Sequence, residues 1–89
     1  MIEKTLQIVN EKGLHARASA RLVEVVERFN AAAEVEKDGM SVSGDSIMGL
    51  LMLAASRGTE ITVRITGPEA ESLAHALEEL VAERFGEDM

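Results

Sequence analysis

A histidine and three cationic side chains gather in a segment that contains no acid. Lys12, His15, Arg17 and Arg21 all fall within residues 12–23, where no carboxylate occurs, although the whole chain carries a formal charge of −7. Imidazole can be neutral and nucleophilic at neutral pH, and arginine binds anions through directed N–H groups. These residue types predict a nucleophilic histidine at the edge of an anion-binding site.

A helix is expected to begin inside this segment. Gly13 indicates a turn, and apolar side chains then recur at helical spacing over a predicted helix from about Ala16 to Phe29. His15 takes the N-cap position, where Ser, Thr, Asp or Asn is usual. The free N–H groups of the first turn and the positive end of the helix dipole would help the arginines to bind an anion. The alternative is an ordinary surface histidine beside a helix start.

The rest of the chain predicts four strands and two further helices, in the overall order β-α-β-β-α-β-α. Asp38–Gly39 is typical of a two-residue hairpin, and Pro68 fits the first position of the last helix. The expected elements are strands at Ile2–Val9, Ala32–Lys37, Met40–Ser43 and Ile61–Thr66, helices from Ile47 to about Leu53 or Ala55 and from Pro68 onward, and an acidic tail at Gly86–Met89. This order favours an α+β protein with one antiparallel or mixed sheet and helices on one face. Spacing does not determine the strand order.

Composition excludes several classes of protein. A chain of 89 residues suits one small domain, expected over 1–89, and a hydrophobic content of 46% is typical of a folded protein. The acidic balance argues against nucleic-acid binding. No apolar run reaches the ~20 residues of a membrane span, and the N-terminus lacks signal-peptide features. Cysteine is absent and the two histidines lack metal-ligand spacing, so we expect a cytoplasmic protein without disulfide, cofactor or metal.

Two motifs carry a resemblance to a known family. Residues 13–17 read GLHAR and residues 46–50 read SIMGL. Together they resemble HPr, the histidine-containing phosphocarrier family of the bacterial phosphoenolpyruvate-dependent phosphotransferase system, over the whole length of the chain. The resemblance implies an open-faced β-sandwich, with a four-stranded antiparallel sheet and three helices on one face. It also implies a carrier that is not itself an enzyme: His15, with Arg17, would accept phosphoryl on Nδ1 from phospho-enzyme I and pass it to enzyme II A-type domains.

The start of the predicted helix could receive the phosphoryl charge. Backbone N–H groups of Ala16, Arg17 and Ala18, with the Arg17 guanidinium, are the expected phosphate-binding groups. HPr proteins commonly have proline after the arginine, where this chain has Ala18. Alanine keeps its N–H, so the chemistry is unaffected. The departure leaves open whether the protein serves sugar uptake or the nitrogen-related regulatory branch.

The second motif predicts a partner-binding helix. Residues 47–53 are apolar almost all round, so the helix is either buried or partly exposed to a partner, and partial exposure is favoured. The resemblance implies a docking patch for enzyme I and acceptor domains, made of Ala20, Ile47, Met48, Leu51 and Met52. Ser46 is expected to be the N-cap. In some HPr proteins the matching serine is phosphorylated by a kinase, although Asp45 would repel such a phosphate.

Two other functions remain open from the sequence. One is a regulatory binding module that acts through the Ile47–Leu53 patch and Ser46 phosphorylation without carrying phosphate. The other is a standalone anion-binding enzyme, which is disfavoured because no second catalytic group accompanies His15. His75 is expected to be a solvated residue on the polar face of the last helix. We expect a monomer.

Overall fold

The computed structural model describes residues 1–88, and it confirms the predicted element order. Met89, the last residue of the expected acidic tail, lies outside the described residues. The elements are β1 (Ile2–Gln7), α1 (Ala16–Glu27), β2 (Ala32–Lys37), β3 (Met40–Ser43), α2 (Ile47–Met52), β4 (Glu60–Thr66), α3 (Ala70–Ala82) and a short turn η1 (Arg84–Gly86).

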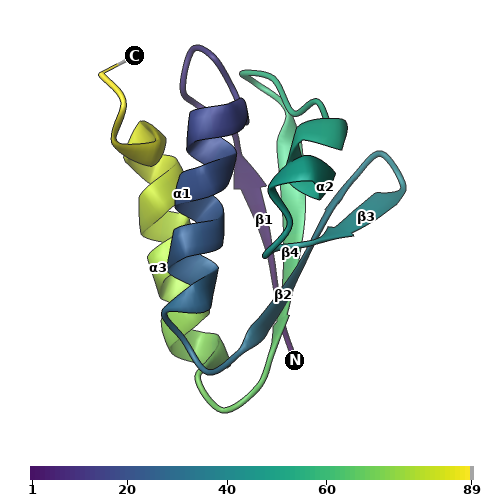
Figure 1. Cartoon of the computed structure of the whole chain (residues 1–89), viewed down its shortest axis with the longest axis vertical. Coiled ribbons are helices and arrows are strands. Elements are labelled where there is room, and N and C mark those ends of the chain that lie inside the picture. Colours follow the sequence, from purple (N-terminus) through teal and green to yellow (C-terminus); the bar gives the residue numbers. More distant parts are fainter. Residues whose placement is uncertain (89) are drawn as a thin grey trace.

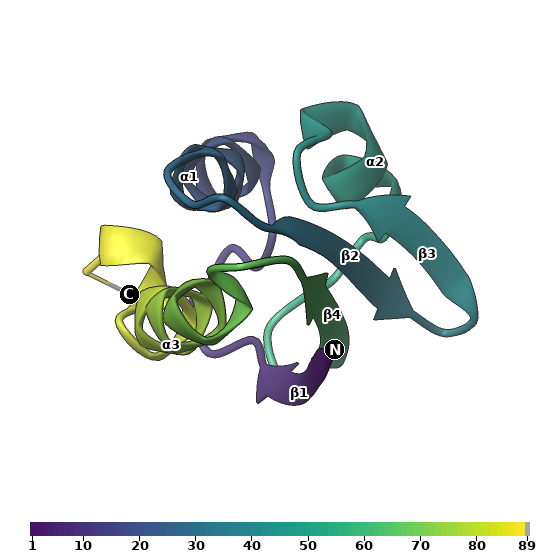
Figure 2. The same ribbon diagram turned by 90° about the horizontal axis from the view of Figure 1, so that it is seen from below.

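One four-stranded sheet runs through the molecule in the order β1-β4-β2-β3, and every neighbouring pair is antiparallel. The three helices lie on one face of this sheet, with α1 between α3 and α2 (Figures 1 and 2). The other face is open and polar. There Arg64 on β4 lies opposite Glu3 on β1 and Glu34 on β2, and its Nε is 2.8 Å from a Glu3 carboxylate oxygen. The α+β class and the helices on a single face are thus confirmed.

The core between the sheet and the helices is aliphatic. The alternation expected in β4 is observed, since Ile61, Val63 and Ile65 are buried while the residues between them are not. Helices α1 and α3 meet this layer with their apolar faces. Phe85, just beyond α3, is fully buried and anchors the end of the described chain to the same core.

Two predicted boundaries are wrong in informative ways. Helix α3 begins at Ala70, because Glu69 is tied outside the helix: its N–H donates to the Asn30 carbonyl, and its carboxylate accepts from the Asn30 N–H at 2.6 Å. Pro68 therefore lies in the preceding turn. The first strand ends at Gln7, not at Val9, and the chain then continues into the loop that leads to His15.

The helix ends also differ slightly from prediction. Helix α1 stops at Glu27, two residues before Phe29, which still packs against the core. Helix α2 ends at Met52, and Ala54 follows with a left-handed φ of 51°, so the chain turns directly after the helix. No helix within residues 1–88 has the length and apolar character needed to cross a membrane.

Candidate functional site

His15 is the N-cap of α1, as expected from the sequence. Its backbone is extended, its carbonyl accepts from the Ser19 N–H at 2.8 Å, and its Nδ1 accepts from the Arg17 N–H at 3.3 Å. Because Nδ1 accepts this hydrogen bond, the lone pair of the neutral ring is at Nδ1 and the proton is at Nε2. The side chain is 27% exposed. Its nucleophilic nitrogen therefore lies at the start of a helix and within reach of a partner.

A close backbone contact holds the loop in front of His15. Gly13 has a φ of +65°, and a Cβ added there would lie 2.5 Å from the Ala55 carbonyl oxygen. That carbonyl accepts from the Leu14 N–H at 2.8 Å. The buried Ser19 hydroxyl donates to the Leu14 carbonyl from the other side. Only glycine fits at position 13, and the result joins the His15 loop to the segment after α2.

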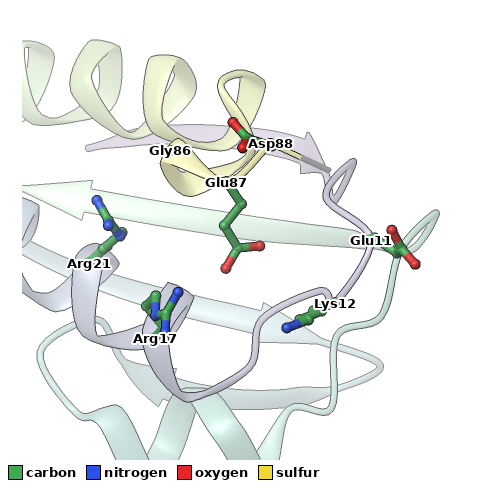
Figure 3. Close-up of a pocket in the computed structure, with 7 residues that line it drawn as sticks. All are labelled: Glu11, Lys12, Arg17, Arg21, Gly86, Glu87 and Asp88. Carbon is green, nitrogen blue, oxygen red and sulfur yellow. The ribbon is translucent and has the colours of Figure 1, made fainter.

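The three cations predicted to surround His15 do come together. Lys12, Arg17 and Arg21 line a shallow depression of about 340 Å³. In Figure 3 the arginine side chains rise from α1 on one side of the depression, and Lys12 lies on the other. Among the described residues no carboxylate forms an ion pair with Arg17. Glu87 links this depression to His15, which does not itself line it.

Three acids also line this depression, Glu11, Glu87 and Asp88, and Glu87 makes a contact that the sequence did not predict. Glu87, treated as part of an acidic tail, points its carboxylate into the depression (Figure 3) and pairs with Nε2 of His15. Its other oxygen accepts from Nδ2 of the buried Asn10 at 2.9 Å. The depression is therefore lined by acids as well as by cations. No local pattern signalled the contact, because 72 residues separate the two partners.

The Glu87 carboxylate is ionised at neutral pH. Burial raises the pKa of its carboxyl group. Hydrogen bonds from Asn10 and His15, together with the positive charge of Lys12, outweigh burial and hold the pKa below its usual range. His15 thus faces a stable anion at Nε2 and a backbone donor at Nδ1.

The three backbone N–H groups expected to bind phosphate differ in how exposed they are to solvent. Ala16 and Arg17 are exposed at the first turn, where N–H groups lack partners within the helix. Ala18 is fully buried, so a phosphoryl group at the surface has no direct path to its N–H. The observed geometry supports Ala16 and Arg17 as phosphate-binding groups more strongly than Ala18.

The short helix α2 exposes part of its apolar surface, as favoured from the sequence. Ile47, Met48 and Met52 are 40%, 69% and 65% exposed, whereas Leu50 is fully buried. Leu51 is half-buried and lines, with His15, a second shallow depression of about 290 Å³. Ala20 is half-buried on α1, which packs beside α2 (Figure 2). The exposed apolar surface is thus continuous with the histidine.

The remaining candidate residues lie as predicted. Ser46 caps α2, and its hydroxyl accepts from the Gly49 N–H at 3.0 Å. Asp45 beside it accepts a hydrogen bond from the Ser43 hydroxyl. His75 has a side chain 74% exposed on α3 and pairs with Glu79 one turn further along. It takes no part in the His15 site.

The same fold, a four-stranded sheet with its helices on one face, is found in solved structures of HPr phosphocarrier proteins. The structure closely resembles the crystal structure of HPr-C-His from Thermoanaerobacter tengcongensis, with a TM-score of 0.94, 37% sequence identity and coverage of 100% of both chains. The family model described as the PTS HPr component phosphorylation site matches residues 2–83. The chain belongs to the HPr family of phosphocarriers of the phosphotransferase system.

Full-length relatives agree with this assignment. The phosphocarrier protein HPr of Xylella fastidiosa (strain Temecula1) is 44% identical over 88 residues, which cover 99% of each chain. The phosphocarrier protein NPr of Escherichia coli (strain K12) is 34% identical over 88 residues and 98% of each chain. The resemblance of the two motifs to HPr is thus confirmed at the level of the family.

Proposed function

We propose that this protein is a cytoplasmic, monomeric phosphocarrier that accepts a phosphoryl group on Nδ1 of His15 from phospho-enzyme I and passes it to enzyme II A-type domains. The observation that supports this most directly is the position of Nδ1. It carries a lone pair at the start of α1 and accepts from the Arg17 N–H, and within residues 1–88 the Arg17 guanidinium forms no ion pair with a carboxylate. The N–H groups of the helix start and this guanidinium are the groups that would bind the phosphoryl oxygens.

The geometry suits transient carriage. A bound phosphoryl group adds about −1.5 to −2 charges by analogy with other protein phosphates, and the helix start and Arg17 would stabilise it. Each charge-assisted hydrogen bond contributes roughly 1.5–3 kcal/mol and makes release harder by the same amount. A shallow site with one mobile guanidinium therefore balances acceptance against release. The partner supplies the rest of the positioning for in-line displacement.

The test is incubation of the protein with phosphoenolpyruvate and enzyme I, followed by intact mass and acid treatment. We expect one added phosphoryl group, which acid removes because it is bound to nitrogen. Label that survives acid, or no label at all, would contradict the proposal. Acceptor domains from the sugar branch and from the nitrogen-related branch are then supplied in parallel. The faster acceptor assigns the branch, which Ala18 after the arginine leaves undecided.

The exposed surface of α2 is proposed as the docking patch for enzyme I. Substituting Met48→Glu should weaken enzyme I binding at least about tenfold, because an unpaired charge in a desolvated contact costs roughly 1–3 kcal/mol or more. The melting temperature should barely change, since the side chain is 69% exposed. Calorimetric titration measures the affinity. Met40→Glu on β3, another exposed methionine, is the matched control. Unchanged affinity for Met48→Glu would remove Met48 from the patch.

We further propose that Ser46 is a regulatory site for a serine kinase. Ser46→Asp should reduce His15 phosphorylation while α2 stays formed, because aspartate also caps helices and its charge suits the dipole. The charge should instead disturb the encounter with enzyme I at Ile47 and Met48, and the effect should shrink at higher salt. The measurement is the dependence of transfer rate on enzyme I concentration at two ionic strengths. Ser46→Asn, a neutral cap of the same shape, is the control, and identical curves for the two variants would mean that Ser46 is only a cap.

A further inference from the structure

Three polar side chains from distant parts of the sequence meet behind the nucleophile. Asn10 comes from the loop after β1, His15 from the start of α1, and Glu87 from the segment after η1. Asn10 is fully buried and the Glu87 side chain is only 15% exposed. A glutamate carboxylate normally stays in water. Its burial here against a functional histidine calls for a physical account.

The chain after α3 is held in an unusual conformation that delivers Glu87 to this place. Arg84 and Phe85 both have left-handed φ angles, 58° and 55°, and Gly86 follows at 80°. Such angles are costly for residues other than glycine and persist only where the surroundings compel them. The buried Phe85 ring supplies that constraint, and Gly86 lies against the Arg21 guanidinium. Glu87 therefore reaches His15 from a firmly anchored turn.

Each carboxylate oxygen of Glu87 has one hydrogen-bond partner. Nδ2 of Asn10 donates to the Gly13 carbonyl at 2.8 Å and to Oε1 of Glu87 at 2.9 Å, which uses both of its N–H bonds. Oε2 then faces Nε2 of His15. An ionised carboxylate can only accept, so this contact requires a proton on Nε2. The Arg17 N–H at Nδ1 requires the same tautomer from the other side of the ring.

We propose that Glu87 is a positioning residue, which Asn10 holds in place and which keeps the proton of His15 on Nε2 so that Nδ1 presents its lone pair to the incoming phosphoryl group. This inference rests on the proposed phosphocarrier function and adds a residue to its site. Glu87 does not touch the reacting phosphorus. It acts through the imidazole ring, in the way that a carboxylate orients a histidine in hydrolytic triads.

In this arrangement phosphoryl transfer can take place without moving the proton on Nε2. The Nδ1 lone pair forms the new N–P bond while the bond from phosphorus to the donor's histidine nitrogen breaks, and the electron pair of that bond stays on the donor. The proton remains on Nε2, so the phosphorylated ring carries a positive charge that faces the Glu87 carboxylate. On delivery the N–P bond breaks, the electron pair returns to Nδ1, and the ring is neutral again. No proton has to enter or leave the site in either direction.

The sharpest test is Glu87→Gln in the full chain. Asn10 and His15 each offer an N–H toward this side chain, but the amide provides only one oxygen. Because Asn10 is buried and already oriented by Gly13, the amide oxygen should stay with Asn10 and the amide N–H₂ should face Nε2 of His15. We expect the proton to move to Nδ1, as observed by ring ¹⁵N chemical shifts. Single-turnover transfer should fall at least about tenfold, because only the ring with a free Nδ1 lone pair reacts.

Two control variants isolate the role of the carboxylate. Glu83→Gln makes the same change at an exposed side chain just after α3, outside both depressions, and should leave the tautomer and the rate unchanged. Glu87→Asp restores a carboxylate and should recover the Nε2–H tautomer. Wild-type tautomer and rate in Glu87→Gln, or equal losses in Glu83→Gln, would overturn the proposal. The tautomer is measured without enzyme I, so it stands separately from a failure of the wild-type protein to accept phosphate.

Discussion

His15→Ala should fold normally and accept no acid-labile phosphate from phosphoenolpyruvate and enzyme I. Among the described residues, His15 is the only histidine at the start of α1, since His75 lies on α3. The hydrogen bond lost at its N-cap is long, so the stability cost should stay below the ~1 kcal/mol typical of a good cap. Asn10 would still hold the Glu87 carboxylate. The measurements are intact mass after labelling and the melting temperature.

His75→Ala is the matched control for this loss. It removes the other histidine from an exposed position on α3, where its only described ion pair is with Glu79. Labelling should therefore match the wild type in both extent and rate. Acid-labile phosphate that persisted in His15→Ala, or that moved to His75, would refute the assignment of the nucleophile.

Local signals in the sequence predicted the parts of the site that lie close together along the chain. A histidine before a helical repeat, a glycine two residues earlier and arginines in the first two turns were enough to predict the N-cap and the two arginines near it. The structure confirms the cap through the Arg17 N–H. The same signals do not explain why Gly13 is required. Glycine is required there because the segment after α2 brings the Ala55 carbonyl too close to position 13 for any Cβ atom.

Contacts made by the tail lay beyond what the sequence could predict. Acidic residues at the end of a chain usually indicate solvation, and Glu87 departs from this only because the buried Phe85 anchors a left-handed turn. That turn depends on the packing of α3 against α1, which no periodicity describes. The predicted start of α3 at Pro68 is wrong for a similar reason. Pro68 is a good local signal, but Asn30, from the loop before β2, fixes Glu69 outside the helix.

For the apolar helix α2, composition alone does not predict which side chains are buried. Its residues are apolar on nearly every side, so the sequence left a buried and an exposed arrangement open. The sheet ends at β3, and α2 lies over this edge (Figure 2). Leu50 turns into the core while Met48 and Met52 remain exposed beyond it. Exposure near His15 thus follows from the size of the sheet.

The contribution of Arg17 can be separated from that of the helix N–H groups. Both could stabilise a phosphoryl group on Nδ1, but only the guanidinium carries a full charge and can move with the transferring group. Arg17 is exposed and forms no ion pair with a carboxylate within residues 1–88, so the folded protein does not depend on its charge. Its removal should affect transfer while the fold stays intact.

Arg17→Glu should slow phosphoryl transfer through His15 by at least an order of magnitude. The lost charge-assisted hydrogen bond contributes roughly 1.5–3 kcal/mol, about 1.4 kcal/mol corresponds to a tenfold change in rate, and the new carboxylate repels the phosphoryl oxygens in addition. Quench-flow measurement of single-turnover transfer reports the rate. Arg28→Glu makes the same charge change at the exposed far end of α1 and should leave transfer nearly unaffected. Equal rates for the wild type and Arg17→Glu would show that the backbone N–H groups of the first turn suffice, since their positions do not depend on the Arg17 side chain.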